Sequence, residues 1–170
     1  IYLNPASLPV SPQFINFINA WKETKFPIVF FNTLFITIFS VLGIILVSSM
    51  AAYAMVRTKS KLSWIFFLIF TFSMVVPFQT IMIPLVVTAK TLNLKNIFGI
   101  IPIYIGLGAP LAIFMYHGFI KGIPLDLEES AAIDGSGPFR IFFTIVLPLL
   151  TPITATITIL DVLWVWNDFL

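Results

Sequence analysis

Four long apolar stretches, separated by short polar segments, account for most of the 170-residue chain. They cover residues 28–56, 62–87, 97–120 and 139–165. A helix of about 20 apolar residues crosses a hydrocarbon core of about 30 Å, because each residue advances it by about 1.5 Å. Each stretch therefore predicts one membrane span. Residues 1–27 are rich in proline and asparagine and then mildly amphipathic, which predicts an external or interfacial segment.

The fold predicted from this pattern is all-α: a polytopic transmembrane helical bundle with about four spans. Pro77 and Pro84 are expected to bend or interrupt the second span near its outer end, because proline lacks the N–H that continues a helix. The third span contains four glycines, a density that lets helices pack closely or lets a span flex.

The polar segment at residues 121–138 differs from the other connections. Four of the seven acidic residues lie within nine positions of it: Asp126, Glu128, Glu129 and Asp134. Pro124 suits the first turn of a helix, and acids there face the positive end of the helix dipole. Gly135 and Gly137 permit a positive φ that ends a helix, and Pro138 prevents it from resuming at once. We therefore predict a short acidic helix from Pro124 to about residue 133.

Basic residues indicate which side of the membrane this helix occupies. Arg57, Lys59 and Lys61 lie within five residues, with no acid between them. Loops rich in lysine and arginine stay on the cytoplasmic side, so this loop and the acidic helix, which shares its side, are predicted to be cytoplasmic. The same orientation places Lys90 and Lys95 outside, which weakens the charge argument when it is taken alone.

Composition narrows the class of protein. Hydrophobic residues make up 59% of the chain and charged residues only 9%, and the mean hydropathy is +1.07. Soluble domains carry about 25% charged residues, so this surface suits lipid. The net charge is only +2 with scattered basic residues, which gives no basis for nucleic-acid binding. With no cysteine and one histidine, neither a disulfide nor a metal site is predicted.

Polar residues within the first span form one stripe. Thr33, Thr37 and Ser40 follow at i, i+4 and i+7, with Asn32 beside them. Small polar residues commonly hydrogen-bond between membrane helices, and the same stripe can also line a translocation path. The sequence leaves both interpretations open.

The last span carries a second stripe, formed by Thr151, Thr154, Thr158 and Asp161. A carboxylate at the bilayer centre costs about 2.5–3.5 kcal/mol on insertion scales, so Asp161 is expected to face the bundle, a watery path or the interface. A transport role and a structural hydrogen bond are both open for it. Trp166 and Asn167 follow, either in an aromatic belt at the outer interface or near an outer mouth.

A longer signature in the acidic segment resembles a known family. From Glu129 to Pro148 the chain reads E-S-A, three residues, G, nine residues, then I-x-L-P. This resembles the EAA loop of binding-protein-dependent ABC importer permeases, and the full LEESAAIDG…IVLPLLTP pattern is most similar to the carbohydrate-uptake branch, which includes the maltose transporter. Ser130 stands where the family usually has alanine, but it is also small. The alternative is an ordinary polar loop with a capped turn.

The resemblance implies the partners and the coupling residues. A second permease subunit, expected as a heterodimer, would complete the pathway, a cytosolic ATPase dimer would hold ATP and Mg²⁺, and an extracytoplasmic binding protein would deliver substrate. This chain would bind no cofactor and would catalyse no reaction. Its contact with the ATPase is expected at the EAA loop, where Glu129 would form a charge-assisted bond, Ala131 would allow close approach and Gly135 would provide the turn. The remaining residues expected there are Glu128, Ser130 and Asp134.

The resemblance also implies a multi-pass protein of the prokaryotic cytoplasmic membrane that imports a sugar or polyol. The chain is expected to be an internal fragment of a longer permease. The residues add that no lysine or arginine lies in the middle of a span, which favours a neutral, hydroxyl-rich substrate, although a phosphorylated polyol stays open. The alternative function is a self-contained secondary transporter or channel. It would need coupling carboxylates within the spans, where only Asp161 is available.

Overall fold

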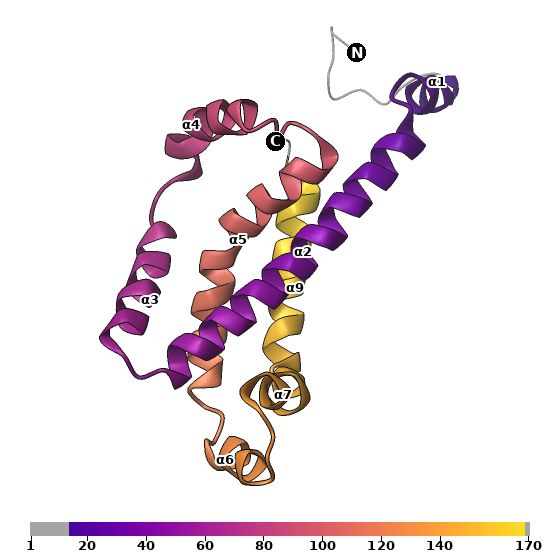
Figure 1. Ribbon diagram of the computed structural model, residues 1–170. Coiled ribbons are helices and arrows are strands. Elements are labelled where there is room, and N and C mark those ends of the chain that lie inside the picture. Colours follow the sequence, from indigo (N-terminus) through magenta and orange to yellow (C-terminus); the bar gives the residue numbers. More distant parts are fainter. Residues whose placement is uncertain (1–13, 169–170) are drawn as a thin grey trace, which may run out of the picture.

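The computed structural model describes residues 14–168, and the regular structure in that range is entirely helical, so the predicted all-α fold is confirmed (Figure 1). The segments are α1 (Ile15–Glu23), α2 (Phe26–Arg57), α3 (Lys61–Ser73), α4 (Phe78–Thr91), α5 (Ile97–Ile120), α6 (Asp126–Ile133), α7 (Pro138–Ile141), the π-helical η1 (Phe142–Val146), α8 (Leu147–Leu149) and α9 (Thr151–Asn167). Of the interfacial segment predicted at residues 1–27, residues 1–13 lie outside the described range. The described remainder includes α1, which buries no side chain.

Helices α2, α5 and α9 pack together as the centre of the bundle (Figure 1). Buried side chains recur on α2 every three or four positions, so one face of this helix is covered. On α5, Gly108 lies against this face, where an added Cβ atom would be 2.5 Å from Ile44 Cδ1. The close packing expected of the third-span glycines is therefore seen at Gly108. At Gly106 an added Cβ would meet nothing within 4 Å.

Within the described residues, α2 and α5 are each long and apolar enough to cross a membrane, and counting each of two bent helix pairs as one span raises the number to four. The second predicted span is one of these pairs, since α3 and α4 meet at 102°. The helix ends at Ser73 and resumes at Phe78, and Pro77 between them is extended. Pro84, which was also expected to disturb the helix, lies inside α4.

The fourth predicted span is the other bent pair. Residues Pro138–Leu149 and Thr151–Asn167 meet at 75°, so the stretch predicted as one span from 139 to 165 contains a sharp corner. Pro148 and Pro152 lie on either side of this corner, and each removes a backbone donor. The π-helix η1 immediately precedes it. Only α9 continues alongside α2 and α5, while α7 lies across the end of the bundle (Figure 1).

Candidate coupling site and translocation path

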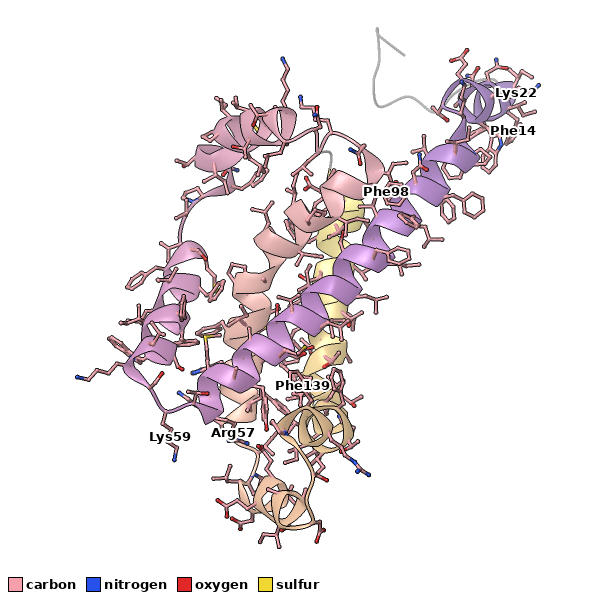
Figure 2. All side chains as sticks on the ribbon, in the orientation of Figure 1. Phe14, Lys22, Arg57, Lys59, Phe98 and Phe139 are labelled. Carbon is pink, nitrogen blue, oxygen red and sulfur yellow. The ribbon has the colours of Figure 1, made fainter. Side chains whose placement is uncertain are left out.

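The acidic segment forms helix α6 beyond the end of α2, the end at which Arg57 and Lys59 lie (Figures 1 and 2). Its first turn contains Asp126, Glu128 and Glu129. The predicted start was two residues too early, because Pro124 precedes the helix and Leu125 is its N-cap. The cluster of acids, rather than the proline, marks where this helix begins.

The predicted glycine turn ends α6. Gly135 has a φ of +81°, a backbone conformation in which any residue with a Cβ atom is strained. The Ser136 N–H donates to the Ala131 carbonyl (2.9 Å), which closes the turn. Gly137 does not use its conformational freedom in this way, since its φ of −73° and ψ of 163° suit any residue. Only Gly135 is therefore required as a glycine by the turn. Asp134, directly before it, is exposed.

Two neighbouring acids on α6 point to different surroundings. Glu128 is only 6% exposed and faces the chain's own α2. Its Oε1 accepts from Arg57 Nε (2.9 Å) and Nη2 (2.6 Å), and its Oε2 accepts from the Tyr53 hydroxyl (2.8 Å). Arg57 Nη2 also donates to the Ile123 carbonyl (3.2 Å). Glu129, one residue later, is exposed.

Sequence reasoning grouped Glu128 with the exposed acids and missed its partners. Tyr53 and Arg57 lie in the last turns of α2, and they are 75 and 71 residues away from Glu128 along the chain. The sequence offers no signal that would pair them. An open cleft of about 400 Å³ beside the ion pair is lined by Lys59, Lys121 and Pro124 among others.

The outward surface of α6 combines acidic and apolar side chains. Glu129 and Ser130 are exposed, and the Ser130 hydroxyl donates to the Asp126 carbonyl (2.6 Å), which keeps it close to the helix. Ile133 is 86% exposed, an apolar residue on a polar loop that the sequence analysis did not single out. Ala131, expected to face a partner, is half-buried and packs against the chain's own core.

The residues of the polar stripe on α2 differ in burial. Asn32 and Thr33 are half-buried, whereas Thr37 and Ser40 are buried in the bundle. The buried hydroxyls of Thr37, Ser40 and Ser48 have no hydrogen-bond partner among the described residues. Within the described residues these hydroxyls make no helix–helix hydrogen bond, and both interpretations of the stripe stay open.

The stripe of α9 is mixed in the same way. Thr154 does bond between helices, since its hydroxyl lies 2.9 Å from the Tyr116 hydroxyl of α5. Thr158 donates to the Thr154 carbonyl of its own helix (2.7 Å). Asp161 is 4% exposed, and its Oδ2 has no hydrogen-bond partner within the described part of the chain. Buried polar atoms without a partner are few in proteins, and each one needs a reason.

Trp166 and Asn167 lie at the opposite end of the bundle from α6 (Figure 1). The Trp166 ring packs edge-on against Phe30 of α2, with the ring centres 5.7 Å apart. The Asn167 amide donates to the Leu163 carbonyl (2.6 Å). Across residues 14–168, no three His, Asp or Glu side chains are grouped closely enough to hold a metal ion.

Residues 43–170 match a family described as the binding-protein-dependent transport system inner membrane component. The chain belongs to this family. The resemblance drawn from the EAA loop is thus confirmed. The permease family is a family of transport components rather than of enzymes.

Relatives of the permease agree with this assignment. The chain is 45% identical over 170 residues to the probable starch degradation products transport system permease protein of Thermoanaerobacterium thermosulfurigenes, covering 100% of this chain and 62% of the relative. It is 42% identical over 164 residues to the melibiose/raffinose/stachyose import permease protein of Bacillus subtilis, covering 95% and 59%. The chain therefore spans about 60% of the length of these relatives.

A solved structure shares the arrangement of the permease helices. A chain of a bacterial ABC transporter that imports the acidic polysaccharide alginate superposes with a TM-score of 0.73 at 28% identity, covering 82% of this chain and 49% of that one. The bundle, including its bent segments, is thus an ABC transporter permease fold.

Proposed function

We propose that this permease is a transmembrane subunit of an ATP-driven, binding-protein-dependent importer for a sugar or polyol in the cytoplasmic membrane of a prokaryote. It crosses that membrane several times and works with a second permease subunit, a cytosolic ATPase dimer that holds ATP and Mg²⁺, and an extracytoplasmic solute-binding protein. The observation that carries the proposal is α6, which presents Glu129 and Ile133 outward at the end of the bundle and ends at a glycine in the left-handed conformation.

The exposed side chains of α6 fit the surface of a partner. Ile133 is the most exposed large apolar residue described, and a partner that covered it would remove this apolar surface from water. Glu129 beside it offers a carboxylate for a basic side chain of the ATPase, and such bonds are about twice as strong as neutral ones. Gly135 sets the direction in which the chain leaves this contact.

The substrate class is supported by polar groups within the spans and by the relatives. The hydroxyls of Thr37 and Ser40 and the carboxylate of Asp161 are buried in the described bundle, so a hydroxyl-rich substrate can bond them only in a conformation that opens it. The two relatives described above are named for starch degradation products and for melibiose, raffinose and stachyose. A neutral oligosaccharide is the substrate that both observations favour.

The test is reconstitution of the full-length permease with its ATPase and binding protein in liposomes, with Glu129→Lys as the variant. We expect ATP-dependent uptake of labelled oligosaccharide by the wild type, and loss of uptake together with weaker ATPase co-purification in the variant. The matched control is Glu23→Lys, the same charge change at an exposed site on α1. Uptake that follows an ion gradient without ATP, or a Glu129→Lys variant that transports fully, would refute the proposal.

A further inference from the structure

Three donor atoms of the permease converge on the buried carboxylate of Glu128. The Arg57 guanidinium and the Tyr53 hydroxyl together make three hydrogen bonds to it, at 2.6 to 2.9 Å. A fourth bond joins Arg57 to the Ile123 carbonyl, in the connection between α5 and α6. The last turns of α2 are thus bound directly both to α6 and to the segment that leads into it. We name Tyr53, Arg57 and Glu128 the inner lock.

The inner lock is shielded from water, which makes it stiffer than a surface ion pair. The side chains of Arg57 and Glu128 are only 19% and 8% exposed. Exposed pairs exchange their partners with water and contribute little, whereas removing one member of a buried pair leaves an uncompensated charge. The pair therefore holds one geometry, and α6 cannot shift relative to α2 without breaking charge-assisted bonds.

Of the two covalent routes from α6 into the bundle, the one that leads toward α9 is bent by comparison. After Gly135 the chain passes through the extended Gly137, the short α7, the π-helix η1 and the 75° corner before it reaches α9. Each break lets a displacement at α6 be absorbed locally. The route through the inner lock instead leads at once into α2, which is one uninterrupted helix of 32 residues packed on both α5 and α9.

The geometry points to α2 as the element that receives the displacement of α6, with the inner lock as the connection between them. Tyr53, Arg57 and Glu128 are positioning residues for coupling, since they face the chain's own helices and not the surface offered to the ATPase. This inference depends on the proposed function. It separates the two acids of the loop: Glu129 binds the ATPase, and Glu128 transmits its motion.

The experiment compares ATP hydrolysis and uptake in the same liposomes, using the full-length permease assembled with its ATPase and binding protein. Glu128→Gln keeps the shape of the side chain and removes its charge, whereas Arg57→Gln removes the charge and shortens the side chain. We expect each to retain co-purifying ATPase and ATP hydrolysis, while the uptake per ATP hydrolysed falls about tenfold or more, the range for bonds to charged groups. Tyr53→Phe keeps the ion pair, and we expect a fall of about twofold to fivefold.

Charge reversal and a matched control separate coupling from folding. Arg57→Glu combined with Glu128→Arg restores the opposite charges, and we expect uptake per ATP to recover above either single reversal. Lys59→Gln removes a nearby exposed cation and should leave the ratio unchanged. An unchanged ratio in Glu128→Gln overturns the inner lock. If Glu128→Gln does not insert, Tyr53→Phe decides: a lower ratio supports the lock, and an unchanged ratio overturns it.

The same experiment distinguishes this inference from the proposed function. A wild-type permease that binds no ATPase refutes the proposed function, whatever the variants do. A wild type that couples hydrolysis to uptake, with variants that couple equally well, refutes only the inner lock.

Discussion

Substituting Gly108 by alanine tests the packing of α2 on α5. The new Cβ would lie 2.5 Å from Ile44 Cδ1 and 3.2 Å from Ile44 Cγ1, whereas its 3.4 Å approach to Trp164 Cζ3 is an ordinary contact, so the clash falls on α2. Ile44 is fully buried, and it cannot turn away without displacing other core residues. Overpacking of this kind costs about 1–3 kcal/mol.

The control for Gly108→Ala is Gly106→Ala on the same helix. An added Cβ at Gly106 meets nothing within 4 Å, so only the helix propensity changes there, by about 1 kcal/mol in favour of alanine. Because both variants share this gain, the difference between them isolates the clash. We expect Gly108→Ala to be less stable than Gly106→Ala by about 1–3 kcal/mol.

Unfolding of the full-length permease in mixed micelles, with increasing mole fraction of denaturing detergent, measures this difference. Binding of the ATPase can be followed in parallel, to show that the folded fraction is native. Equal free energies of unfolding for the two variants would refute the assignment of Gly108 as the close contact between α2 and α5.

Three further substitutions test other features. Gly135→Ala places a side chain at φ +81°, which costs about 1–2 kcal/mol, so we expect weaker ATPase co-purification, while Gly137→Ala, at an ordinary φ, should bind as the wild type does. Asn96→Ala removes the side chain that accepts from the first N–H groups of α5, and detergent unfolding should show a loss of about 1 kcal/mol. Asp161→Asn removes a buried charge that costs about 2.5–3.5 kcal/mol at the bilayer centre, so a role in the path predicts lower uptake with unchanged or higher stability. Lower stability with unchanged uptake would show a structural role instead.

The sequence predicted the helical class, the acidic helix and the family, because each depends on local pattern. A run of apolar residues sets the length of a helix, and the acids and Gly135 mark the ends of α6 within a few residues. The same reasoning expected a bend at both Pro77 and Pro84 and could not tell which of them breaks the helix. Pro77 lies at a 102° break while Pro84 sits inside a helix, although both are prolines in apolar surroundings. Which of them breaks the helix depends on packing against other helices, and the local sequence does not specify that packing.

The burial of Glu128 and the exposure of Glu129 also depend on packing between distant parts of the chain. Adjacent residues on a helix point about 100° apart, so one of two neighbouring acids turns inward whenever the helix lies against a surface. Which one does so depends on Arg57, 71 residues earlier in the chain. For the polar stripes, periodicity grouped Thr37 and Asp161 with their neighbours but left their surroundings open. The structure buries both, and among the described residues Thr154 has a partner on α5 while Thr37 Oγ1 and Asp161 Oδ2 have none.

The length of α2 has a consequence for the membrane around it. Its 32 residues extend about 48 Å, against a hydrocarbon core of about 30 Å, and its apolar character continues almost to Arg57. A helix longer than the bilayer is accommodated by tilting, and Figure 1 shows α2 crossing α5 and α9 at a slant. A thicker bilayer would favour a more upright α2, and a thinner one a more inclined α2. Lipid thickness would thus act on the same helix that the inner lock holds at its Arg57 end, and under the proposed function ATPase motion would act on that helix through the lock.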